Sequence, residues 1–176
     1  MGTRYAALIR GINVGRAKRV SMSDLRALMD GLGFRDCRTL LNSGNIVFTA
    51  SGAAAGIGAR IEQALVAELG VAARAIVLGA GEFAVVVEHN HLPKSADDPS
   101  RVLVAFVRDA AGVRRLAVLK KERWDPEVLA VGKRAAYLWC PGGVGKSPLW
   151  EAVGRVLGED TTARNWATVR KLRALL

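Results

Sequence analysis

The apolar segments of this chain follow one order twice, and this repetition limits the folds open to it more than any other feature. In the first half, short apolar strands alternate with helices whose apolar residues recur every three or four positions. An Asn-Ser-Gly-Asn sequence between two of the strands predicts a hairpin turn. The expected elements are a strand at Tyr5–Ile9, a helix over Leu25–Leu32, strands at Arg38–Leu41 and Ile46–Thr49, a helix over Ile57–Leu69 and a strand at Arg74–Leu78.

The second half repeats this β-α-β-β-α-β order. Ser147 is expected to cap a helix that has Pro148 as its first residue and ends at Gly158. Two units in this order are typical of a duplicated ferredoxin-like arrangement. The expected elements are a strand at Val102–Val107, a helix at Val113–Lys120, strands at Val128–Val131 and Ala135–Cys140, the helix after Ser147, a strand at Thr161–Ala163 and a helix at Asn165–Leu176.

The sequence therefore predicts an α+β fold of two duplicated, ferredoxin-like-related βαββαβ subdomains with a C-terminal helix. The first subdomain is expected at residues 1–88, where a short helix at Glu82–Glu88 completes it. The second subdomain is expected at residues 101–176. Residues 89–100 hold both histidines and two prolines, and this composition predicts a linker.

The composition provides a core and excludes several classes of protein. Hydrophobic residues make up 51% of the chain, which is ample for a packed interior. No run of about 18 apolar residues occurs, so no membrane partner is expected. Cys37 and Cys140 lie far apart, which excludes a disulfide framework and favours a cytoplasmic protein.

Three familiar site motifs fail on spacing or context. Gly145–Ser147 resembles the end of a phosphate-binding P-loop, but Cys140 stands where that motif needs a glycine. Gly79–Ala84 matches a dinucleotide-binding fingerprint, but the helix after it is short and no parallel strand follows. His89 and His91 have no third ligand nearby in the sequence. We therefore expect no cofactor and no metal, and no acid/base pair for catalysis can be identified.

Four loops remain as candidates for binding. They span residues 10–22, 42–45, 142–147 and 161–166, lie at the ends of expected elements and are rich in hydrogen-bond donors. The net charge of +10 favours an anionic partner. For each loop the alternative is architectural: a buried network, a tight turn or a helix start. The candidate anion-binding residues are Arg10, Gly11, Asn13, Gly15, Lys18, Ser43, Gly44, Asn45, Gly142, Gly145, Lys146, Ser147, Arg164 and Asn165.

Motifs in and around these loops carry a resemblance to a known family. They are Ala7–Gly15, Leu41–Phe48, Tyr137-Leu138, Pro141–Ser147, Thr162–Trp166 and Thr168-Val169. The sequence resembles the DUF1697 family, bacterial proteins of unknown function, and the likeness spans nearly the whole chain. It implies an α+β fold of two ferredoxin-like-related subdomains and no established activity. Arg16 and Asn42 stand where the family usually has Gly and Gln.

Three functions fit these features. The first is an anion-binding module for nucleic acid or a phosphorylated ligand; the second is a structural or protein-interaction domain; an enzyme acting on a small anionic substrate is less favoured. Tyr137 and Trp139 share one strand face and could stack bases or pack in the core. For nucleic acid, backbone contacts are expected from Arg10, Arg16, Lys18, Arg19, Lys146 and Arg164.

Overall fold

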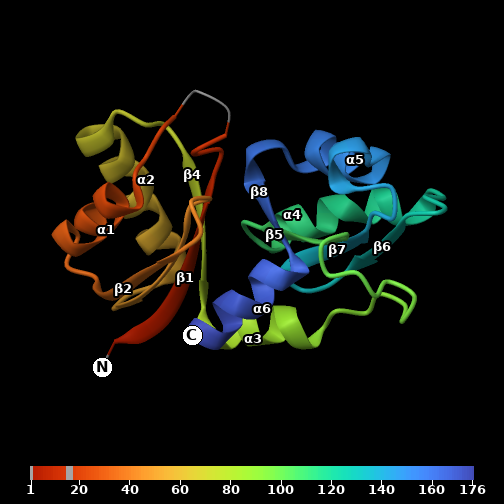
Figure 1. Cartoon of the computed structure of the whole chain (residues 1–176), viewed down its shortest axis with the longest axis horizontal. Coiled ribbons are helices and arrows are strands. Elements are labelled where there is room, and N and C mark those ends of the chain that lie inside the picture. The colour runs from red at the N-terminus through yellow and green to blue at the C-terminus, as the bar shows by residue number, and fades with distance from the viewer. Residues whose placement is uncertain (1, 15–17) are drawn as a thin grey trace. The chain divides into compact units, whose positions relative to one another are not determined.

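The computed structural model describes residues 2–14 and 18–176 (Figure 1). The chain divides into two compact units: one contains the chain up to Phe83 together with Leu172–Leu176, and the other contains Ala84–Lys171. Each unit has a four-stranded antiparallel sheet, so the predicted α+β fold of two βαββαβ-like subdomains with a C-terminal helix is confirmed. The linker at residues 89–100 and the subdomain bounds beside it stay predictions.

The first unit has the strand order of a ferredoxin-like sheet. Its first strand is central, since Ala7 lies opposite Ile46 on one side and Val77 on the other. Both helices lie on the same face of the sheet (Figure 1). The elements are β1 (Thr3–Arg10), α1 (Met22–Gly31), β2 (Arg35–Leu40), β3 (Asn45–Ala50), α2 (Ala54–Leu69) and β4 (Arg74–Gly79), in the sheet order β2-β3-β1-β4.

The core of the first unit lies between this sheet and the two helices. Leu25 and Leu28 of α1 belong to one buried cluster with Ile57 and Ile61 of α2 and Phe48 of β3. These are apolar residues whose spacing predicted the helices and strands. Burial of each such side chain stabilises the fold by about 1.5–3 kcal/mol relative to exposure.

The second unit repeats the strand order. Its buried cluster joins Leu103 of the central strand to Leu149, Val153 and Leu157 of the long helix. The elements are α3 (Ala80–Glu88), which crosses from the first unit, β5 (Val102–Val107), α4 (Ala110–Arg115), β6 (Val128–Val131), β7 (Ala135–Trp139), α5 (Pro148–Leu157), β8 (Thr161–Asn165) and α6 (Trp166–Leu175), in the sheet order β6-β7-β5-β8.

Several element bounds differ from the expected ones by up to three residues, as in β2, which begins at Arg35, and two differences lie in the second unit. The helix expected at Val113–Lys120 is the short α4 followed by a 3₁₀ segment at Leu116–Lys121. It starts earlier because the Asp109 carboxylate accepts a hydrogen bond from the Gly112 main-chain N–H and so caps α4. The last strand extends to Asn165, past the expected end at residue 163. Within the described residues, no helix has the length and apolar composition needed to cross a membrane.

Candidate functional site

Asn13 closes the loop that follows β1. Its Nδ2 group donates to the Val20 carbonyl at 2.8 Å and to the Asn42 carbonyl at 2.9 Å. Its Oδ1 accepts from the Val20 main-chain N–H at 2.9 Å, and its own N–H donates to the Lys18 carbonyl at 3.1 Å. Both donors of the amide are therefore used inside the protein, and they tie loop 10–22 to the turn before β3.

The turn between β2 and β3 is fixed against β1. The Ile9 main-chain N–H donates to the Gly44 carbonyl at 2.8 Å. The buried Asn45 side chain donates to the Leu40 carbonyl at 3.0 Å and to the Ser43 hydroxyl at 2.9 Å. Ser43, Gly44 and Asn45 thus hold the shape of a turn that supports the Asn13 loop.

A pocket of about 420 Å³ opens where these two loops meet. It lies at the start of α1, where the Ser21 hydroxyl accepts from the Asp24 N–H at 3.0 Å. Arg19 in its wall is exposed, and so is Lys18, the preceding residue of the chain. A helix N-terminus and a guanidinium both favour anions. The pocket is lined by Asn13, Arg19, Val20, Ser21, Met22 and Asn42.

Backbone strain gathers around this pocket. Among the described non-glycine residues, positive φ angles occur at Asn13 (57°), Lys18 (51°), Leu41 (59°) and, elsewhere, Asp36 (54°). Such conformations concentrate at binding sites, where the surrounding structure holds them in place. Leu41 is 54% exposed and Val14 is 72% exposed. The two loops therefore present apolar as well as cationic side chains.

Three further predicted residues belong to loop 10–22. Arg10 is half-buried at the end of β1. Gly11 is exposed and has φ 73°, which requires glycine-like freedom. Gly15 lies outside the described residues, as does Arg16.

In the second unit, the start of α5 already holds a carboxylate of this chain. The Ser147 hydroxyl caps the helix by accepting from the Trp150 N–H at 2.9 Å, as the sequence predicted. The buried Glu127 accepts from the Leu149 N–H, also at 2.9 Å. Nothing in the sequence marks Glu127 as a partner of α5, because the two are 22 positions apart. At this helix start the Leu149 N–H is thus bonded to a carboxylate of the chain itself, and anion binding by loop 142–147 stays a prediction.

The second half of loop 142–147, from Val144 on, lines a second pocket, whereas Gly142 does not. Gly142, Gly145 and Lys146 are exposed. The pocket has a volume of about 350 Å³. Lys146 faces it together with Glu151, so the pocket has no net positive charge from its side chains. It is lined by Val144, Gly145, Lys146, Ser147, Trp150 and Glu151.

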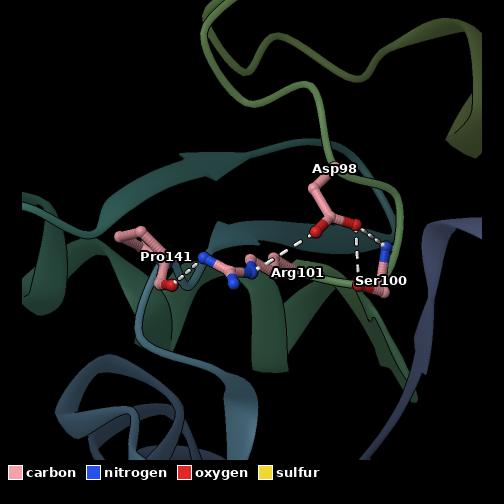
Figure 2. A network of polar contacts seen from close by, with 4 residues as sticks. All are labelled: Asp98, Ser100, Arg101 and Pro141. Carbon is pink, nitrogen blue, oxygen red and sulfur yellow. Dashed lines mark hydrogen bonds and ion pairs between the residues drawn. The ribbon is translucent and has the colours of Figure 1, made fainter.

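A single guanidinium holds the loop after β7 (Figure 2). Arg101 donates from Nη1 to the Pro141 carbonyl, and its Nε lies 3.3 Å from an oxygen of Asp98. The Asp98 carboxylate accepts from the Ser100 hydroxyl at 2.6 Å and from the Ser100 N–H at 2.9 Å. These hydrogen bonds lower the pKa of Asp98. Arg101 thereby joins the end of segment 89–100 to the loop that precedes α5.

Residues 161–166 form a strand end and a helix cap. The half-buried Arg164 donates from Nη1 to the Thr162 hydroxyl at 2.9 Å and to the Ala163 carbonyl at 2.7 Å. Burial lowers the pKa of Arg164 to about 10. The Asn165 Oδ1 accepts from the Thr168 N–H at 2.9 Å and so caps α6. The Asn165 acceptor oxygen thus serves the helix start, and anion binding by Asn165 stays a prediction.

The aromatic side chains offer little for base stacking. All four phenylalanines and both tyrosines are buried. The Tyr137 hydroxyl donates to the Val86 carbonyl at 2.6 Å, and burial raises the pKa of Tyr137 to about 12. Of the two expected roles of Tyr137, core packing is the observed one. Trp139, its expected stacking partner, is half-buried.

The histidines and acidic groups form no metal cluster in the described chain. The His89 and His91 rings lie edge to face with their centroids 5.7 Å apart. The Nδ1 atom of His89 is 2.9 Å from the Val85 carbonyl oxygen. Among residues 2–14 and 18–176, no three His, Cys, Asp or Glu side chains gather as metal ligands would.

Replacing Asn13 tests its role as the closure of loop 10–22. Asn13→Ala removes three hydrogen bonds, and we expect a loss of about 1–3 kcal/mol in the free energy of unfolding of the first unit. Hydrogen exchange of the Val20 amide should become faster, since its acceptor is lost. Asn42→Ala is the matched control, because Asn42 contributes only its main-chain carbonyl to the network. Unchanged exchange at Val20 in Asn13→Ala would contradict this role.

Comparison with known proteins gives a family model and a solved structure that are similar to the chain. A family model described as "Protein of unknown function (DUF1697)" matches residues 2–137. The motifs at 141–147 and 162–169 lie beyond that range. A solved structure titled as the conserved bacterial protein SP0830 from Streptococcus pneumoniae is 27% identical, with a TM-score of 0.82; the match covers 100% of this chain and 99% of that one. No curated protein matches the chain.

Proposed function

The chain belongs to the DUF1697 family of proteins of unknown function, and we propose that it is an anion-binding module with its site in the pocket beside α1. The observation that carries the proposal is the meeting of loops 10–22 and 42–45 around this pocket, with Arg19 in its wall. The ligand is a phosphate group, either of a phosphorylated small molecule or of a nucleic-acid backbone.

The chemistry of the pocket suits a phosphate. The first N–H groups of a helix have no partner within the helix, and they carry partial positive charge. Arg19 adds a planar guanidinium that can donate two parallel hydrogen bonds to phosphate oxygens. Lys18, exposed next to it, adds a second cation. The net charge of +10 would raise the local concentration of anions around this surface.

For nucleic acid, the arrangement supports binding through the backbone. Ferredoxin-like RNA-binding domains stack bases on aromatic side chains of the sheet. Here Phe48 and Tyr137 are buried, so neither offers a free ring face. Contacts from Lys18 and Arg19 to phosphates would then dominate, and these carry no direct information on base sequence. We therefore expect weak sequence preference and strong dependence on salt.

One observation favours a second candidate, a structural or protein-interaction domain. The side chains of Asn13, Asn45, Ser147 and Asn165 all make hydrogen bonds within their own unit. These residues belong to the motifs that resemble the family, and their architectural use needs no ligand. Phosphate binding must then rest on Lys18, Arg19 and the main chain of α1.

The test is binding of labelled single-stranded RNA, single-stranded DNA and duplex DNA, followed by fluorescence anisotropy over a range of salt concentrations. We expect the double variant Lys18→Ala/Arg19→Ala to bind more weakly. Its slope of log K against log salt should fall by about 2, since each lost phosphate contact contributes about 1. Arg170→Ala/Lys171→Ala on α6 is the matched control, because it removes the same charge from exposed positions.

Small phosphorylated ligands are tested in parallel by thermal shift, with inorganic phosphate and pyrophosphate as probes. Stabilisation that disappears in Lys18→Ala/Arg19→Ala and persists in the α6 control supports a small-ligand pocket. Equal loss of nucleic-acid binding in both double variants would mean that binding depends on the overall surface charge and not on the pocket beside α1. Absence of binding in both assays would contradict the proposal and leave the structural role as the better one.

A further inference from the structure

The strand β6 forms an edge of the second sheet, with its outer hydrogen-bonding groups facing away from β7. It pairs with β7 only, with Leu129 opposite Leu138 and Val131 opposite Ala136 in the described chain. The Gly132 N–H donates to the Ala135 carbonyl at 2.8 Å, so Gly132 and Ala135 form a hydrogen-bonded pair of the ladder. Such pairs alternate along an antiparallel ladder. The main-chain N–H and C=O of Leu129 and Val131 therefore point outward.

Strand β2, one of the two edge strands of the first sheet, is protected, whereas β6 is not. In β2 the pairing register shifts between Arg35 and Arg38, Asp36 has φ 54°, and all three charged side chains are exposed. Bulges and charges of this kind prevent another strand from pairing with an edge. By contrast, β6 reads Val-Leu-Ala-Val and is half-exposed along its whole length. Strand β2 thus carries features that prevent pairing with another strand, whereas the edge strand β6 lacks them.

A pocket of about 260 Å³ lies beside this open edge. Leu119, Trp124, Val128 and Leu129 contribute its apolar lining, and the charged residues Lys120, Glu122 and Glu127 complete it. The Trp124 indole N–H donates to the Leu119 carbonyl at 2.9 Å, which fixes the orientation of the ring. An open strand edge with a side-chain pocket next to it is the arrangement by which proteins bind extended peptides: the main chain provides affinity and the pocket provides selectivity.

The charge around the edge selects the occupant. The segment before β6 and the turn after it carry four exposed basic side chains and two exposed acidic ones. A second copy of this chain, with its own net charge of +10, would bring the same charges together. An acidic segment would complement them. The basic residues are Lys120, Lys121, Arg123 and Lys133, and the acidic residues are Glu122 and Asp125.

We propose that β6 binds an extended, acidic peptide segment of another protein as a fifth strand of the sheet, with one apolar side chain of the peptide in the Leu119–Trp124–Leu129 pocket. This site lies in the second unit and does not depend on the phosphate site proposed beside α1. A failure of phosphate binding therefore leaves the peptide proposal intact, and a failure of peptide binding leaves the phosphate proposal intact.

The probe is a short labelled peptide with a Val-Thr-Val-Ile-Val centre and two glutamates at each end. Its twin has lysines at the ends. We expect the acidic peptide to bind the full-length protein at least about tenfold more tightly than the basic one, a difference of about 1.4 kcal/mol. Hydrogen exchange of the Leu129 and Val131 amides should slow on binding, because these amides gain acceptors from the peptide.

Two changes separate strand pairing from simple charge attraction. Val131→Pro removes an outward N–H that β7 does not use, and we expect binding to be lost. Peptides methylated on alternate main-chain nitrogens test the same point without altering the protein: one of the two alternate patterns should abolish binding and the other should preserve it. Lys121→Glu/Arg123→Glu should weaken binding of the acidic peptide, whereas Arg170→Glu/Lys171→Glu on α6 should change it little.

Several results would overturn the proposal. Equal binding of both methylated peptides would exclude pairing through the main chain. Equal binding of the acidic and basic peptides would exclude the charge argument. A dimer in sedimentation experiments that Val131→Pro dissociates would make a second copy of the chain the occupant instead. Loss of peptide binding in the Lys18→Ala/Arg19→Ala variant would place the peptide at the α1 pocket.

Discussion

Gly44→Ala is expected to destabilise the first unit by about 2–5 kcal/mol, because two penalties combine. Gly44 has φ 75°, where a side chain costs about 1–2 kcal/mol. A Cβ atom there would lie 3.0 Å from the Ile9 Cβ, the Ile9 carbonyl oxygen and the Ile12 Cδ1. The two Ile9 atoms are part of the core strand β1 and cannot move aside. This steric overlap adds about 1–3 kcal/mol to the destabilisation. The turn and β1 would have to separate.

The control for Gly44→Ala is Gly33→Ala. Gly33 follows α1 with φ 77°, and an added Cβ would meet no atom within 4 Å. This variant therefore suffers only the backbone penalty, about 1–2 kcal/mol. Unfolding in urea, followed by circular dichroism and by hydrogen exchange of β1 and β3, measures both variants. Equal destabilisation of the two would mean that the approach of the turn to β1 carries no energetic weight.

Gly44→Ala should also weaken phosphate binding. The Gly44 carbonyl accepts the Ile9 N–H, and the neighbouring Asn42 carbonyl accepts from Asn13. A displaced turn would release Asn13 and widen the pocket beside α1. Gly33→Ala, at the other end of α1, should leave phosphate binding close to that of the parent protein.

Glu127→Ala is expected to destabilise the second unit by about 2–3 kcal/mol. The buried carboxylate accepts from the Leu149 N–H at the start of α5. Its removal leaves a buried donor without this acceptor and takes a negative charge away from the positive end of the helix. All four tryptophans lie in the second unit, so tryptophan fluorescence during urea unfolding follows this effect selectively.

Glu127→Gln separates the hydrogen bond from the charge. Glutamine keeps an acceptor oxygen at a similar position, so we expect a smaller loss, about 1 kcal/mol, from the helix-end charge alone. Glu151→Gln is the control, because Glu151 lies in the first turn of the same helix and is exposed. If Glu127→Ala and Glu151→Gln destabilised the protein equally, the buried contact between Glu127 and Leu149 would not matter.

The Glu127 variants also bear on where an anion can bind. With Glu127 removed, the start of α5 would have room for an external phosphate beside Gly145 and Lys146. Stabilisation of the second unit of Glu127→Ala by phosphate, followed by tryptophan fluorescence and absent from the second unit of the parent protein, is the expected result. Its absence would show that loop 142–147 does not hold an anion even when the position is open.

Much of the local structure follows from local sequence. The spacing of Leu25, Leu28 and Met29 predicts α1, and these residues are buried against the sheet. Ser147 and Pro148 predict the start of α5, where Ser147 caps the helix. Such features depend on residues a few positions apart, which is the range over which helix periodicity and capping act.

The candidate site was predictable only in part. The sequence indicates that loops 10–22 and 42–45 are unusual, and these loops do meet at a pocket. It does not indicate that both donors of Asn13 bind main-chain carbonyls, one of them 29 positions away. Whether an Asn or Ser in a loop binds a ligand or its own backbone depends on the nearest acceptor after folding, and sequence spacing contains no information on that distance.

By itself the sequence determined the α+β class, the repeated order of strands and helices, and the basic character of the chain. The tertiary structure alone decided that Glu127 reaches the start of α5, that Tyr137 is buried, and that β6 is left open at a sheet edge. The physical reason is the separation in sequence over which each interaction acts. Helix periodicity and caps involve residues within one or two helical turns. Strand order and buried polar pairs join residues that are far apart in the sequence and meet only when the sheets form.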